Sequence, residues 1–146
     1  MARAVPKDQL KKIIHDGDAE VLVNAASEFG LALAQDRLSK SQIRNVFGEV
    51  RNIEAAWSEP DDNAPSNSAA NSAQNLRKLL LLKPRMAYQG KREPKAQPLM
   101  TTLTDAIDLV VAERTKLPLT ALYGRFKHFT EFFEAILAYH TAGGGK

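Results

Sequence analysis

The 146-residue sequence contains no cysteine. Disulfides, thiolate metal sites and cysteine nucleophiles are therefore excluded, and the composition fits a reducing compartment, so we expect a cytoplasmic protein. No apolar run approaches the roughly 20 residues that span a bilayer, and no membrane partner is expected. The first residues, MARAVPKDQLKK, have a basic start without an apolar segment behind it, which is not the pattern of a signal peptide.

Patterns typical of catalysis are also missing. The three histidines lie on separate segments, and none has a second histidine or an acid at a metal-ligand spacing such as HExxH. We expect His128 and His140 at the edge of the core. No serine stands in a nucleophile elbow, and the GGGK tail lacks the Ser/Thr, strand and helix of a phosphate loop. The sequence therefore predicts a protein that is not an enzyme, without metal or cofactor.

Nearly every periodic segment has the helical period, and no strand is indicated. Asp18 and either Ser39 or Ser41 are suitable N-caps. Pro84 is expected to break or kink its helix and to redirect the chain. The predicted helices cover residues 7–16, 19–35, 41–57, 72–82 with a continuation at 84–91, 101–114 and 119–140.

The segment from residue 59 to residue 73 is rich in Ser, Asn, Asp, Ala and Pro and has no large apolar side chain. Such a composition is typical of a mobile loop, and we place one here, on an edge of the domain. Residues 91–98 contain two prolines and are predicted to be a connector. The sequence thus predicts a single all-α domain over residues 1–146, a compact bundle of five to six helices with a flexible tail at 142–146.

Positive charge is concentrated, although the formal net charge is only +3. Between Arg77 and Lys95 there are seven cations and one anion, whereas the stretch from Glu59 to Asn75 has three acids and no base. A local excess of this kind favours a polyanionic partner.

The helix predicted at 41–57 has a core face and, beside it, a basic stripe. The stripe consists of Lys40, Arg44, Gly48, Arg51 and Ala55. Long cationic side chains reach phosphates, and a glycine lets a backbone or sugar come close. The stripe from residue 40 to residue 51 spans about 16 Å, enough for a few phosphates. The alternative is a solvated face whose arginines pair with local acids.

A second basic surface is predicted in LLLLKPRMAYQGKR, residues 79–92. If this stretch is helical, Arg85, Tyr88, Gln89 and Arg92 share one face. An exposed tyrosine between arginines is suited to stacking on a base while the guanidinium groups bind phosphates. The alternative is a tyrosine half-packed against the core. Two such surfaces, without a catalytic constellation, favour RNA or DNA binding.

Three segments taken together resemble the small subunit of type III-A CRISPR effector complexes, the Csm complexes. These segments are LSKSQIRNVFGEVRNI, LLLLKPRMAYQGKR and FKHFTEFFEAILAYH, in this order, and the similarity extends over residues 38–140. The elements S-x-I-R-N, L-K-P-R-x-A-Y and F-x-x-F-F-E-A-x-x-A-Y-H are specific in combination. The first 35 residues contribute nothing to it.

The resemblance implies an all-helical, non-catalytic subunit of an antiviral defence complex, present in several copies that stack on one another. Such subunits line the channel in which target RNA pairs with guide RNA, and they contact the backbone and large subunits. Their basic residues face the RNA backbone and do not read sequence, because base pairing supplies the specificity. By position, the RNA-binding residues would be Lys40, Arg44, Arg51, Lys83, Arg85, Tyr88 and Arg92.

Other classes of function stay open at this point. A helical DNA-binding regulator would use a helix-turn-helix, with Arg44 and Asn45 after the turn near residues 36–39, although the usual turn glycine is missing. A protein-binding scaffold would use the basic stripe for acidic partners. A metal-independent ribonuclease is a more distant alternative.

Overall fold

The computed structural model describes residues 1–146 and is helical throughout, with no strand, as the periodicity predicts. The six α-helices and two short 3₁₀ turns are α1 (Lys7–Ile14), α2 (Ala19–Gln35), α3 (Lys40–Ala56), α4 (Pro65–Arg92), η1 (Pro94–Ala96), α5 (Gln97–Val111), η2 (Arg114–Lys116) and α6 (Leu119–Ala142). None of these helices combines the length and the hydropathy that a membrane span requires.

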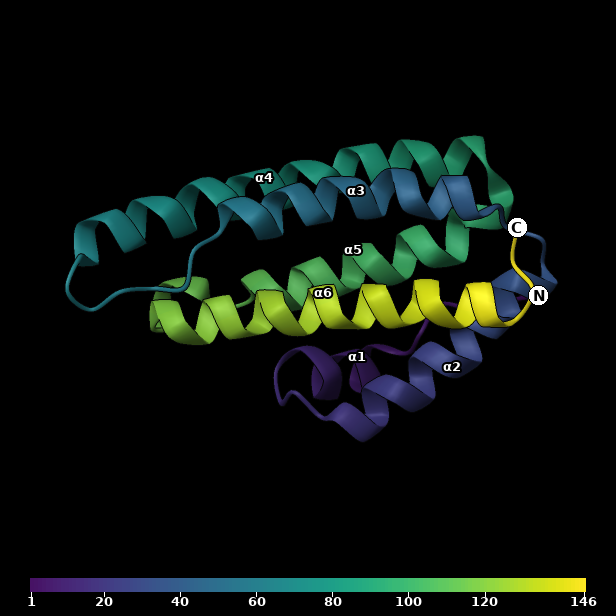
Figure 1. Cartoon of the computed structure of the whole chain (residues 1–146), viewed down its shortest axis with the longest axis horizontal. Helices are drawn as coiled ribbons and strands as arrows, with labels where there is room; N and C mark the ends of the chain where they lie inside the picture. Colours follow the sequence, from purple (N-terminus) through teal and green to yellow (C-terminus); the bar gives the residue numbers. More distant parts are fainter.

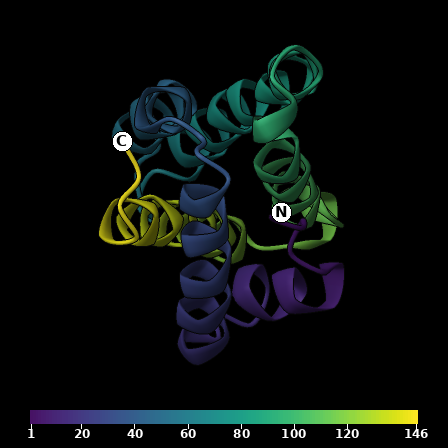
Figure 2. The same cartoon turned by 90° about the vertical axis from the view of Figure 1, so that its right-hand side faces the viewer.

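The helices form three layers of two, which are clearest in the end view (Figure 2). α3 and α4 lie side by side in the first layer, α6 and α5 in the middle, and α2 and α1 beneath them (Figure 1). α6 is central and packs against all five other α-helices. Because α3 and α4 form an outer layer, their outer faces are free to meet a partner.

The core is one cluster of 31 buried apolar residues. Four phenylalanines of α6 have no exposed surface, at positions 126, 129, 132 and 133. Their spacing of three and four residues places them on the inner side of the helix. Phe126 stacks on Trp57 at the end of α3, and Phe133 meets Phe47 of α3. Because α6 also packs against α1 and α2, it joins both outer layers.

The helix starts show why the chain turns where it does. The Asp18 carboxylate accepts a hydrogen bond from the Val21 N–H at 3.1 Å, as predicted for the cap of α2. Of the two predicted caps of α3, the structure uses Ser39, in a capping box with Gln42. Arg37 adopts a left-handed conformation (φ 64°) in the short turn before it.

The predicted mobile loop at 59–73 is shorter in the structure, because α4 begins at Pro65. Proline is favoured at a first helical position, and the alanines that follow are strong helix formers. Asn71 ties this end of α4 to α3: its amide donates to the Ala56 carbonyl at 2.9 Å and accepts from the Ser58 N–H at 2.9 Å. Between α3 and α4, only residues 57–64 lie outside the helices.

Pro84 does not break α4, which is helical on both sides of it (Figure 1). The prediction of a break was wrong because Leu79 and Leu82 before the proline and Met86 after it are all buried. Packing over several turns outweighs the roughly 3 kcal/mol that an internal proline costs an isolated helix. The four leucines do not all anchor the segment, since Leu81 is exposed.

The ends of the chain lie at the same end of the molecule (Figure 1). In the structure α6 includes Ala142, the first residue of the tail 142–146 that was expected to be flexible. The rest of this tail takes part in two main-chain hydrogen bonds. The Gly145 N–H donates to the His140 carbonyl (2.9 Å), and the Lys40 N–H donates to the main-chain oxygen of Lys146 (2.8 Å). Gly145 also packs against the His140 ring. The tail therefore covers the start of α3 and is held there by main-chain hydrogen bonds.

Candidate nucleic-acid interface

The predicted basic stripe lies along the solvent side of α3. Arg44 and Arg51 are exposed, and Lys40 is half-buried at the first turn. Arg44 forms no ion pair, so its guanidinium is available to an anion. The inner side of α3 packs on α6, where Phe47 meets Phe133 edge to face with ring centroids 5.1 Å apart. This packing sets the direction of the stripe.

Gly48 leaves an open position in the middle of the stripe. A Cβ added there would have no atom within 4 Å. The glycine is therefore not required by a neighbouring helix or by its backbone conformation, in contrast to Gly30 of α2, where a Cβ would lie 2.7 Å from the Ile136 main-chain oxygen. A free gap between cations is the geometry that the sequence predicted for close approach of a nucleic-acid backbone.

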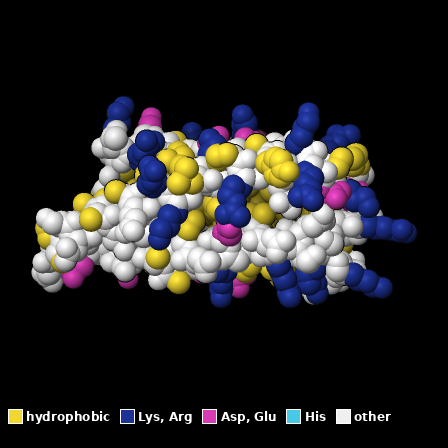
Figure 3. All heavy atoms as spheres, turned by 90° about the horizontal axis from the view of Figure 1, so that it is seen from above, with side chains coloured by type: hydrophobic (Ala, Val, Ile, Leu, Met, Phe, Trp, Pro, Cys, Tyr) yellow, Lys and Arg dark blue, Asp and Glu magenta, His cyan; other side chains and the backbone are white.

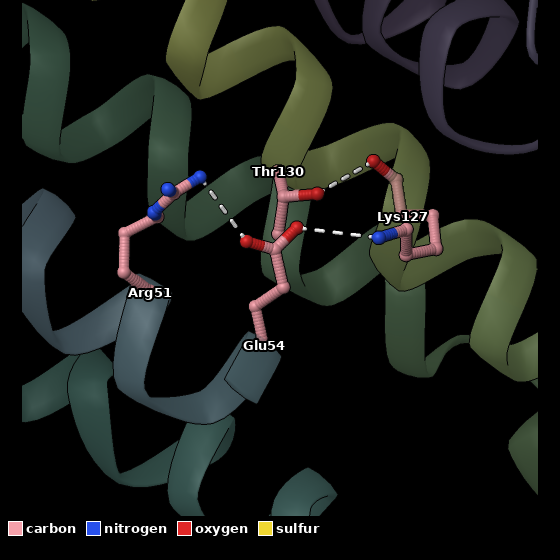
Figure 4. A network of polar contacts seen from close by, with 4 residues as sticks. All are labelled: Arg51, Glu54, Lys127 and Thr130. Atoms are coloured by element: carbon pink, nitrogen blue, oxygen red, sulfur yellow. Dashed lines mark hydrogen bonds and ion pairs between the residues drawn. The ribbon is translucent and has the colours of Figure 1, made fainter. Parts of the chain in front are cut away.

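Arg51 belongs to a network that joins α3 to α6 (Figure 4). Its guanidinium lies 5.6 Å from the centre of the Phe47 ring and 3.3 Å from the Glu54 carboxylate. The other oxygen of that carboxylate is 3.3 Å from the Lys127 ammonium. The alternative of pairing with a local acid therefore holds for Arg51 and not for Arg44.

The second basic surface is helical, as expected. Tyr88 is 67% exposed, which excludes the alternative of a tyrosine half-packed against the core. Arg85 and Arg92 are also exposed, at three residues before and four residues after the tyrosine on the outer face of α4. Gln89 is half-buried, toward α3. An open ring between two guanidinium groups is accessible to a base and to the phosphates on either side of it.

The predicted residues of α4 divide between its two flanks. Arg85 forms an ion pair with Glu49 of α3 and remains largely exposed. Lys83 pairs with Asp108 of α5, on the other flank of the helix. Six of the seven predicted residues thus lie on the outer surface of α3 and α4 or on its edge next to α6. The seventh, Lys83, points toward α5.

Seen from above, the layer of α3 and α4 has Lys and Arg side chains over most of its length (Figure 3). They are absent from the left-hand end, where α4 begins after the acidic residues 59–62. The outer faces of the two helices therefore form one elongated cationic face, which we call the α3–α4 face. It is defined by Lys40, Arg44, Gly48, Arg51, Arg85, Tyr88 and Arg92.

Lys127 is a cation at the edge of this face that the sequence did not indicate. It stands between Phe126 and His128 in the aromatic helix α6, and its ammonium reaches Glu54 of α3 across 73 positions of the chain. No local pattern could have found it, because its proximity to Arg51 depends on the packing of α3 against α6.

The histidines have structural positions. Each donates a ring N–H to a main-chain carbonyl: His15 to Leu109 at 2.7 Å, His128 to Ile14 at 2.8 Å and His140 to Leu38 at 2.6 Å. His128 is half-buried, as expected for the edge of the core, whereas His140 is fully buried and lies deeper than expected. No group of three or more His, Asp or Glu side chains is arranged to hold a metal ion.

A cavity of about 500 Å³ lies between the N-terminal residues 1–6 and α2. None of the residues that line it belongs to the α3–α4 face. A cavity next to that face, between α3 and α4, is small, about 60 Å³. The site is thus an open surface suited to a polymer, not a pocket for a small molecule.

Comparison with known proteins agrees with the resemblance noted in the sequence. The family described as Csm2 Type III-A matches residues 16–146, which includes all of α2 and both basic surfaces. The match begins earlier than the three segments on which the resemblance was based. No curated protein and no solved structure matches the chain. The chain belongs to the Csm2 family, the small subunit of the type III-A Csm complex.

Proposed function

We propose that the chain is a non-catalytic RNA-binding subunit of a type III-A CRISPR interference complex in the cytoplasm. Several copies stack along the duplex of guide RNA and target RNA, and each touches the RNA backbone without reading its sequence. The backbone and large subunits of the complex are its other partners. Family membership supports the place in the complex, and the α3–α4 face supports the contact with RNA.

This proposal rests on the exposure of Arg44, Arg92 and Tyr88. All three side chains are exposed to solvent, and neither arginine forms an ion pair with an acidic residue. Cations without partners repel one another, and binding a polyanion removes that cost while it releases counterions. The absence of a groove-reading helix is consistent with contacts to phosphate and sugar alone.

The helix-turn-helix alternative receives no support from the packing. A recognition helix must be braced by the helix before it, but α3 packs on α6 and α4, and α2 packs on α6 and α1. In the end view α2 and α3 lie on opposite sides of α6 (Figure 2). The geometry therefore favours RNA backbone binding over a DNA-binding regulator.

The proposal predicts that Arg44→Ala/Arg92→Ala weakens binding to an unstructured single-stranded RNA by about tenfold, or about 1.4 kcal/mol. The affinity of the unmodified chain should fall steeply with salt. The double variant should show a shallower slope, by about 0.7 for each phosphate of a single strand that the protein no longer neutralises. Titration followed by NMR chemical shifts measures both quantities, even when binding is weak.

The matched control is Lys7→Ala/Lys12→Ala, which removes the same charge from exposed positions of α1, in the opposite layer. If both double variants lost the same RNA affinity, the loss would come from the change in net charge alone, which would contradict the proposed site. Binding that does not respond to salt would also contradict it. A strong preference for duplex DNA would support the regulator instead.

Gly48 gives a test that separates RNA binding from stability. Gly48→Ala should raise the free energy of unfolding by about 0.5–1 kcal/mol, because alanine is a better helix former and its Cβ meets nothing. Gly48→Gln should fold equally well but block the gap, so RNA affinity should fall severalfold. Thermal unfolding and the same RNA titration measure the two effects.

The control for this pair is Val23→Gln, at an exposed position of α2 in the layer opposite the α3–α4 face. This variant places the same glutamine side chain away from that face and should leave RNA affinity unchanged. Unaltered affinity in Gly48→Gln would show that the gap has no part in binding.

A further inference from the structure

The Glu54 carboxylate lies between two cations that come from different helices (Figure 4). One oxygen is 3.3 Å from Arg51 Nη1, and the other is 3.3 Å from Lys127 Nζ. The side chain of Glu54 is 25% exposed, whereas those of Arg51 and Lys127 are 55% and 42% exposed. The carboxylate is thus the more enclosed partner, and both cations extend past it into solvent.

Arg51 has a side-chain contact other than Glu54. Its guanidinium lies over the Phe47 ring, a cation–π contact, and Phe47 itself packs on Phe133. The main chain of Lys127 lies in a turn of α6 where its carbonyl accepts a hydrogen bond from the buried Thr130 hydroxyl at 2.8 Å (Figure 4). The ammonium of Lys127 pairs with Glu54 alone. If the carboxylate moves away, Arg51 therefore keeps its place over Phe47, and the Lys127 ammonium is released to bind another anion.

We propose that Lys127 is a further phosphate-binding residue of the α3–α4 face, and that Glu54 is an internal anion that holds the place of an RNA phosphate. This inference rests on the proposed RNA-binding function and adds a residue from a third helix to its site. A phosphodiester has one negative charge and two non-bridging oxygens, so it can accept from Arg51 and Lys127 as the carboxylate does.

Glu54 has two consequences for affinity. In the absence of RNA it removes the repulsion between the neighbouring cations, and when RNA binds it competes with the phosphate for the same two donors. The carboxylate therefore lowers the affinity of each copy for RNA. Weak, exchangeable contacts suit a subunit that binds backbone of any sequence, since several copies together supply the stability of the assembly.

The test uses the full chain and a fluorescein-labelled oligouridylate at low salt. Glu54→Gln keeps the shape of the side chain and removes the charge, so we expect threefold to tenfold tighter binding and a steeper dependence on salt. Lys127→Ala should weaken binding severalfold. The matched controls are Glu20→Gln on α2 and Lys12→Ala on α1, which make the same charge changes in the opposite layer.

The combined variant Glu54→Gln/Lys127→Ala separates local competition from net charge. If the carboxylate acts by occupying Lys127, the gain from Glu54→Gln should fall to less than half once the lysine is absent. A full gain in the combined variant would overturn the proposal, as would a Glu54→Gln affinity equal to that of Glu20→Gln. If one of these results overturns the role of Glu54 and Lys127, the proposed RNA-binding function still stands as long as Arg44→Ala/Arg92→Ala loses affinity. If the unmodified chain shows no salt-dependent binding to RNA, both the proposed function and this inference fail.

Discussion

Trp57→Ala is expected to lower the free energy of unfolding by about 3–5 kcal/mol, the range for loss of a buried large aromatic side chain. Trp57 is the C-terminal cap of α3 and is 2% exposed. Its ring stacks on Phe126 with centroids 4.5 Å apart and meets Tyr123 edge to face at 6.3 Å. Alanine would leave a cavity where the end of α3 joins α6, and chemical denaturation measures the cost.

The control is Trp57→Phe, which keeps a stacked ring. The indole N–H is buried without a hydrogen-bond partner, so its removal relieves one unfavourable term while the smaller ring loses some packing. We expect the free energy of unfolding to fall by only about 1 kcal/mol. Similar losses for the phenylalanine and alanine variants would show that the indole ring does not stabilise this junction by stacking.

Gly30→Val is expected to destabilise the fold by about 3 kcal/mol, because a side chain cannot fit between α2 and α6. A Cβ at Gly30 would lie 2.7 Å from the Ile136 main-chain oxygen and 2.8 Å from the Tyr139 Cβ. The contact involves main chain, so a change of rotamer cannot relieve it and the helices must separate. Thermal unfolding should show a midpoint lower by about 10 °C or more.

The matched control is Gly124→Val, at another helical glycine with no atom within 4 Å of an added Cβ. This variant should change the free energy of unfolding by no more than about 0.5 kcal/mol, since the helix propensities of valine and glycine differ little. Equal destabilisation at the two positions would mean that helix propensity, and not the close approach of α2 to α6, determines the result.

The helical nature of the chain could be read from the sequence because each helix has a buried face with a 3.6-residue period. Local chemistry also determined the starts of α2 and α3, where the side chains of Asp18 and Ser39 bind main-chain N–H groups. The central place of α6 follows in part from its phenylalanines, which are too apolar to face solvent.

The start of α4 and the effect of Pro84 could not be predicted in this way. The first turns of α4 are polar, and their order depends on Asn71 and Asn75, which donate to the Ala56 carbonyl at the end of α3. Pro84 is accommodated because α3 and α5 pack against α4. Both features depend on neighbours remote in sequence, and composition contains no information about them.

In the candidate site, helical spacing alone is enough to predict which cations share a helix face, both in the stripe of α3 and in the group of Arg85, Tyr88 and Arg92. Which of the predicted cations are free depends on the packing of the helices, because Glu49 and Asp108 reach Arg85 and Lys83 from other helices. This packing alone brought Lys127 next to Arg51. The physical reason is the distance along the sequence over which each interaction acts. Helical period and capping involve residues a few positions apart, whereas ion pairs between helices depend on how the amphipathic faces pack in the folded chain.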